Sequence, residues 1–95
     1  MISAIVMIKA DVARIPEVAA EIVAIDGISE VYSVTGEIDL IAVARVARHE
    51  DFHTVIADQL NKVPGVLETS THIAFRTYSD QDLEAGFALG LEDGD

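Results

Sequence analysis

Four short aliphatic runs alternate with two segments of helical apolar spacing, and this order constrains the fold more than any other feature. The runs cover 2–9, 28–35, 40–47 and 66–77, and their β-branched content predicts strands. The helical segments follow the first and third runs, so the order is βαββαβ. This order predicts an α+β, ferredoxin-like domain: a four-stranded antiparallel sheet with both helices on one face.

Each predicted helix has an apolar face and a stop signal. The first carries Pro16 in its first turn, where a missing N–H costs nothing, and ends at Asp26-Gly27. The second ends at Pro64-Gly65. The residues with helical spacing are Ile15, Val18, Ala19 and Ile22 in the first helix, and Phe52, Val55, Ile56, Leu60 and Val63 in the second.

Composition and charge exclude several classes of function. The chain has 95 residues, enough for one domain, and it contains no Cys, so disulfides, thiolate chemistry and Cys-bearing metal sites are excluded. The net charge of −11 argues against direct nucleic-acid binding, which needs a basic surface. No apolar run is long enough to cross a membrane and no signal peptide begins the chain, so we expect a cytoplasmic protein.

The sheet face that the helices leave open is expected to be apolar. Ile5 and Met7 alternate with the inward residues of 2–9, and Ile41 and Val43 do the same in 40–47. A patch of this kind is larger than a monomer usually exposes, so we predict that a second copy covers it. The alternative is that the C-terminal tail folds over this face.

That tail, 79–95, is expected to stand apart from the domain formed by 1–78. Residues 80–95 contain six acids and no base. Ser79 and Asp82 have the spacing of a capping box, and Leu83 and Phe87 are four residues apart. We expect a short helix, or an arm that docks on a neighbouring chain.

The segment His49-Glu50-Asp51-Phe52-His53 matches the H-E-x-x-H pattern of zinc enzymes. A catalytic zinc needs a third protein ligand and an open cleft, and Phe52 marks the start of a helix, so the two imidazoles need not share a face. We therefore prefer a solvated helix start and predict no metal, no cofactor and no catalytic residue. A small dimeric enzyme that uses His49, Glu50 and His53 with a metal is the alternative hypothesis.

The connection between the second and third runs is a candidate ligand site. An α-amino acid needs a carboxylate for its ammonium group and N–H or hydroxyl donors for its carboxylate. Asp39 offers the carboxylate, and the Gly36 backbone with Thr69 or Thr71 offers the donors. The alternative is that Gly36 and Asp39 are ordinary turn residues and the threonines ordinary strand residues.

At these positions the sequence resembles the ligand-binding domain of the Lrp/AsnC (feast/famine) transcriptional regulators. The resemblance covers about residues 2–78 and is carried by Gly27-Ile28, by Val34-Thr35-Gly36-Glu37-Ile38-Asp39-Leu40, and by Val63-Pro64-Gly65-Val66 with Thr69-Ser70-Thr71. It implies a homodimer formed through the sheets, assembly into an octamer or similar ring, and amino acids bound between dimers. The ligand-binding residues implied are Ser33, Thr35, Gly36, Asp39, Thr69, Thr71 and His72.

The chain departs from the family in one respect, because the regulators begin with a helix-turn-helix domain and this sequence starts at the first strand. We therefore expect a stand-alone, non-enzymatic module that does not itself bind DNA. Such a module would sense or buffer an amino acid, or would co-assemble with a full-length Lrp/AsnC regulator.

Overall fold

The computed structural model describes residues 1–78, and its elements follow the predicted order. The tail expected at 79–95 lies outside the described residues. The strands are β1 (Ile2–Ala10), β2 (Ile28–Ser33), β3 (Leu40–Val46) and β4 (Val66–Ile73). The helices are η1 (Val12–Arg14), α1 (Ile15–Val23), η2 (His53–Gln59) and η3 (Leu60–Lys62). Strand β4 is shorter than predicted, because regular pairing ends at Ile73.

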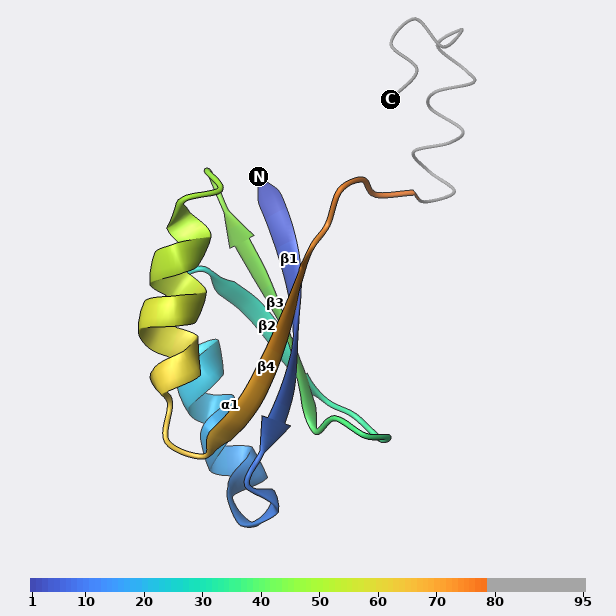
Figure 1. Cartoon of the computed structure of the whole chain (residues 1–95), viewed down its shortest axis with the longest axis vertical. Coiled ribbons are helices and arrows are strands. Elements are labelled where there is room, and N and C mark those ends of the chain that lie inside the picture. Colours follow the sequence, from blue (N-terminus) through green and yellow to red (C-terminus); the bar gives the residue numbers. More distant parts are fainter. Residues whose placement is uncertain (79–95) are drawn as a thin grey trace, which may run out of the picture.

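The strands form one sheet in the order β2-β3-β1-β4, and every neighbouring pair is antiparallel. The helices lie together on one face of this sheet, and the hairpin between β2 and β3 projects away from them (Figure 1). This arrangement confirms the predicted ferredoxin-like α+β fold. It leaves β2 and β4 as the two edges of the sheet.

The start of the first helical segment is set by local hydrogen bonding. The Asp11 carboxylate accepts from the Ala13 N–H at 3.0 Å and caps η1, and Pro16 occupies the first turn of α1. Val18 and Ile22 are fully buried against the sheet, one helical turn apart, as their spacing predicts.

The second helical segment buries the predicted face, but its geometry differs from an ordinary α-helix. Phe52, Val55, Ile56 and Leu60 are all buried. Over His53–Gln59 the helix is π-helical, and the Leu60 N–H donates to the carbonyls of both Val55 and Ile56. Apolar spacing alone does not distinguish this wider helix from an α-helix, so the sequence did not predict it. No helix within residues 1–78 is both long and apolar enough to cross a membrane.

The strand register sorts the two sheet faces as predicted. Toward the helices, alternate residues of the two central strands are buried, and these are Ala4, Val6, Ile8, Ala10, Leu40, Ala42, Ala44 and Val46. On the open face, Ile5 pairs with Val43 and Met7 with Ile41. Ile5 is 40% exposed although it lies on a central strand. Within residues 1–78 no element covers this apolar face (Figure 1).

Candidate functional site

The hairpin that joins β2 to β3 is held closed by main-chain and side-chain bonds around Asp39. The Val34 N–H donates to the Asp39 carbonyl at 3.1 Å, and the Asp39 N–H donates to the Ile8 carbonyl at 2.9 Å. The Asp39 Oδ2 atom also accepts from the Ala10 N–H at 2.9 Å. Asp39 therefore fastens the hairpin to the end of β1, and its Oδ1 atom is left for another donor.

Gly36 lies at the tip of this hairpin with a φ of +111°, which side chains rarely adopt. A Cβ atom at Gly36 would meet nothing within 4 Å, so the tip stands in open space. The sequence therefore needs glycine here for its backbone conformation and not for lack of space.

The two predicted threonines lie on the helix side of edge strand β4. Thr69 pairs with Ile8 and Thr71 with Val6, both of which are buried beneath the helices. The Thr69 hydroxyl donates to the Asn61 Oδ1 atom at 2.8 Å, which links β4 to η3. Thr69 and Asp39 flank Ile8 from opposite sides, so their strands lie about 10 Å apart.

The remaining predicted residues are farther from one another. His72 pairs with Ile5 on the open face, and its Nε2 atom lies 3.4 Å from the Ser70 hydroxyl. Ser33 pairs with Leu40 at the other edge of the sheet. One chain therefore brings Asp39 and Thr69 to the same end of the sheet, but it does not gather all the predicted residues into one pocket.

The H-E-x-x-H segment does not form a metal site in this structure. His49 packs edge-on against Phe52 with ring centroids 6.2 Å apart, Glu50 pairs with Arg48 at 3.7 Å, and His53 lies 3.6 Å from Asp58. These side chains therefore face three different partners. Among residues 1–78, no group of three or more His, Asp or Glu side chains is placed to hold a metal ion.

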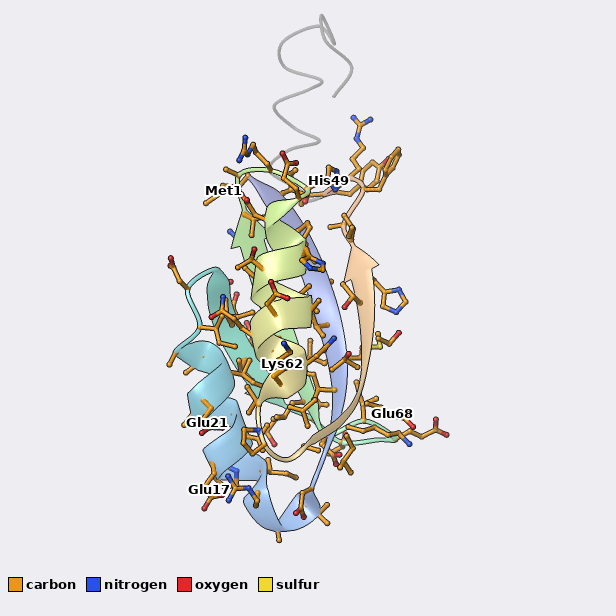
Figure 2. The ribbon with its side chains drawn as sticks, turned by 60° about the vertical axis from the view of Figure 1, so that its left-hand side comes forward. Met1, Glu17, Glu21, His49, Lys62 and Glu68 are labelled. Atoms are coloured by element: carbon orange, nitrogen blue, oxygen red, sulfur yellow. The ribbon has the colours of Figure 1, made fainter. Side chains whose placement is uncertain are left out.

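Two cavities lie at the opposite end of the sheet from the hairpin, near Met1 and His49 (Figure 2). One measures about 390 Å³, and its lining includes Ser3, His49 and Arg76. The other measures about 340 Å³ and lies among the α1–β2 turn, the end of β3 and the second helical segment. The sequence predicted neither cavity, because their lining residues are scattered along the chain and form no motif.

The open face also carries a polar pair beside its apolar centre. The Tyr32 hydroxyl donates to the Glu30 carboxylate, two residues earlier on β2. This hydrogen bond, with a smaller contribution from desolvation, raises the pKa of Tyr32 above its ordinary value, and the charge of Arg45 acts in the opposite direction.

Comparison with known proteins identifies relatives of one kind. Residues 3–83 match the sequence profile of the Lrp/AsnC ligand binding domain. The HTH-type transcriptional regulator FL11 of Pyrococcus abyssi is 31% identical over 77 residues, which are 81% of this chain and 50% of that protein. The chain spans about half the length of the curated relatives it matches.

Solved structures share the fold as well as the sequence. The TTHA0845 protein of Thermus thermophilus superposes with a TM-score of 0.79 at 35% identity, over 83% of this chain and 99% of that one. The feast or famine regulatory protein Rv3291c of M. tuberculosis, solved complexed with L-methionine, is 26% identical with a TM-score of 0.69. That match covers 85% of this chain and 55% of the other.

Proposed function

The chain belongs to the Lrp/AsnC family of ligand-binding domains, and from that premise we propose that it is a regulatory module that binds an amino acid and has no catalytic role. The observation that carries the proposal is the match of residues 3–83 to the family's ligand-binding domain. A relative solved with L-methionine supports an amino acid as the class of ligand. Fold alone would not suffice for this, because one fold serves many functions.

The proposed module is an oligomer. Ile5, Met7, Ile41 and Val43 form an apolar centre on a face that no described element covers. Burying this centre against its counterpart in a second copy removes apolar surface from water on both sides. We propose a homodimer packed through the open sheet faces, which assembles further into an octamer or a similar ring.

The proposed ligand site combines the hairpin with the start of β4. The free Oδ1 atom of Asp39 would accept from the ligand ammonium, and the Gly36 backbone with the hydroxyls of Thr69 and Thr71 would donate to its carboxylate. Thr35, Ser33 and His72 would line the remainder. Because β1 separates Asp39 from Thr69, closing such a site requires residues from a second chain.

The module would act by sensing the amino acid or by joining a full-length Lrp/AsnC regulator. A net charge of −11 makes direct contact with DNA phosphates unfavourable, so DNA binding would be the work of the partner. A full-length regulator must be in the same compartment as the DNA that it binds. We therefore propose that this protein is cytoplasmic as well.

Light scattering with and without each of the twenty L-amino acids tests this proposal. A ligand bound between chains favours the assembled state by its differential affinity, so one amino acid should shift the solution mass upward or stabilise the oligomer against dilution. A monomer that no amino acid affects would contradict both the assembly and the ligand. The Asp39→Asn variant should assemble as wild type does but respond more weakly to the ligand.

A further inference from the structure

Two rows of four side chains cross the open face of the sheet from one edge to the other. The strand register places in one row Glu30, Val43, Ile5 and His72, and in the next row Tyr32, Ile41, Met7 and Ser70. Each row therefore has two apolar residues on the central strands β3 and β1, and one polar residue at each edge. The two edges differ in charge, because β2 contributes an acid to the first row and β4 contributes a histidine.

The polar groups at both edges are held by hydrogen bonds within their own strand. On β2 the Tyr32 hydroxyl donates to the Oε2 atom of Glu30, so the half-buried carboxylate stays beside the apolar centre and keeps Oε1 for another donor. On β4 the Nε2 atom of the exposed His72 lies 3.4 Å from the Ser70 hydroxyl, so Nδ1 is the ring nitrogen that remains for a partner.

The other charged groups on this face lie outside the row of His72. Lys9 on β1 pairs with Glu68 on β4, four residues from His72 toward the hairpin. Arg45 on β3 pairs with Ser3, on the opposite side of the row, and its charge acts on Tyr32. The residue that β1 places directly opposite His72 is the uncharged Ile5.

A second copy can pack on these rows in two aligned ways. Two sheets that pack face to face commonly keep their strands within about 30° of each other, and the two-fold axis of such a pair runs either across the strands or along them. An axis across the strands places each edge over the same edge of the partner, which brings the two Glu30 carboxylates together. An axis along the strands places β4 over the partner's β2 within the same row.

We propose that two chains pack about an axis along the strands, so that His72 of each chain lies over Glu30 of the partner subunit. Ile5 then lies over the partner's Val43, and the apolar centre is buried against apolar residues only. The inference rests on the proposed function for the homodimer, and it adds which residues face each other. Its basis is charge complementarity, since this arrangement sets a histidine against an acid at both edges and the alternative sets like against like.

The proposed contact makes the strength of assembly depend on pH. An imidazole ordinarily takes up a proton near pH 6.5, and only the protonated ring attracts a carboxylate as an opposite charge. The contact between His72 and the partner's Glu30 is therefore strongest below about pH 6 and weakens as the ring loses its proton. The two-fold axis repeats the contact, so each dimer contains two such pairs.

Cross-linking of mixed variants tests which residues face each other. The chain contains no cysteine, so Glu30→Cys and His72→Cys each introduce one thiol per chain. A short bifunctional maleimide is added to each variant alone and to the two co-expressed, without any amino acid. In the proposed dimer, identical thiols lie at opposite edges, three strand spacings or about 14 Å apart along the sheet. The co-expressed pair should therefore form cross-linked dimers, and neither variant alone should do so.

A matched control measures cross-linking that does not depend on the interface. Val12→Cys places a thiol on η1, where Val12 is 76% exposed and lies away from the open face. Its co-expression with His72→Cys should give only background. Equal yields from this pair and from Glu30→Cys with His72→Cys would overturn the inference.

Dilution followed by light scattering at pH 5.5 and pH 8 tests the charge pair. Acidification lowers the net negative charge of every variant, so the comparison between variants carries the result. The tightening of the wild-type dimer at the lower pH should exceed that of Glu30→Gln and of His72→Gln by about threefold to tenfold. His53→Gln is the control, because it removes a histidine that lies beside Asp58 on the helical side, and it should respond as wild type does.

The outcomes separate this inference from the proposed function. Cross-links in the co-expressed pair, with a weaker pH response in Glu30→Gln and His72→Gln, support it. Cross-links in either cysteine variant alone, no cross-link in an assembled protein, or a wild-type pH response in Glu30→Gln each overturn it and leave the homodimer standing. A wild-type chain that stays monomeric at both pH values contradicts the proposed homodimer, and the inference fails with it.

Discussion

The Asp39 carboxylate accepts a hydrogen bond from the Ala10 N–H at 2.9 Å, between residues 29 positions apart in the sequence. The bond holds the β2–β3 hairpin to the last residue of β1. The carboxylate that the sequence motif assigned to a ligand therefore has a structural contact as well. A substitution that removes both oxygens, such as Asp39→Ala, affects the hydrogen bond to Ala10 and the proposed ligand contact together. Asp39→Asn keeps an acceptor for Ala10 and removes only the charge.

Replacing Asp39 with Ala should lower the free energy of unfolding by about 1–3 kcal/mol, because the Ala10 N–H loses a charged acceptor in a half-buried site. Asp39→Asn should lower it less. Urea unfolding followed by circular dichroism measures both values. Equal stability of Asp39→Ala and wild type would show that the hairpin does not depend on this bond.

Replacing Ile5 with Glu should convert the assembled protein to monomers. Ile5 pairs with Val43 at the centre of the open face, and a carboxylate there would lose its water when a second copy packs against the sheet. Light scattering measures the change in mass. Val12→Glu is the control, because Val12 is 76% exposed and lies on η1, away from that face. A dimer that survives Ile5→Glu would mean that copies associate through another surface.

Gly27→Ala should destabilise the fold more than Gly36→Ala does. Both glycines have positive φ, so both variants incur backbone strain of about 1–3 kcal/mol. Only at Gly27 would the new Cβ atom clash, 2.7 Å from the Val55 Cγ2 atom.

Thermal unfolding of the two glycine variants, and of Gly27→Ala combined with Val55→Ala, provides the measurement. The double variant should be more stable than the sum of its single effects predicts, because removing the Val55 methyl groups relieves the clash. If the losses of stability in the two single variants simply add in the double variant, the loss in Gly27→Ala comes from backbone strain alone and not from a clash with Val55.

The stability of the fold should fall at alkaline pH in part through Tyr32. The hydrogen bond to Glu30 raises the pKa of Tyr32 in the folded chain above the ordinary 10.0, so the unfolded chain releases its proton first. The stability that this hydrogen bond adds is fully present below pH 10.0. It is lost as the pH rises through the higher pKa that Tyr32 has in the folded chain. Unfolding midpoints across this range should depend less on pH in Tyr32→Phe, and Tyr78→Phe controls for the loss of an exposed tyrosine hydroxyl.

The fold was predictable because its signals are local and agree with one another. In 2–9 and 40–47, alternate residues fall on opposite faces of the sheet, and this period of two separated Val6 and Ala42 from Ile5 and Val43, as the register and the burial confirm. Pro16 and Gly27 marked the limits of the first helical segment in the same local way.

The contacts of the candidate site residues were only partly predictable. The hairpin motif pointed to Asp39, but nothing in the motif reveals that Ala10 already donates to its carboxylate. The cavities near Met1 were hidden as well, because residues that line one of them, such as Asp26 and Thr54, are far apart in the sequence. The sequence also did not predict the π-helical geometry of η2. Apolar spacing indicates which side chains are buried, but it does not indicate which backbone groups form hydrogen bonds with one another.

The amino-acid sequence by itself determined the order of the elements, the apolar face of each one and the excess of negative charge, because each is a property of residues close together in the chain. The tertiary structure decided which polar groups the fold uses internally, as with the Asp39 carboxylate and the Thr69 hydroxyl. Hydrogen bonds and cavities depend on contacts between distant residues, and such contacts exist only once the sheet and helices have packed.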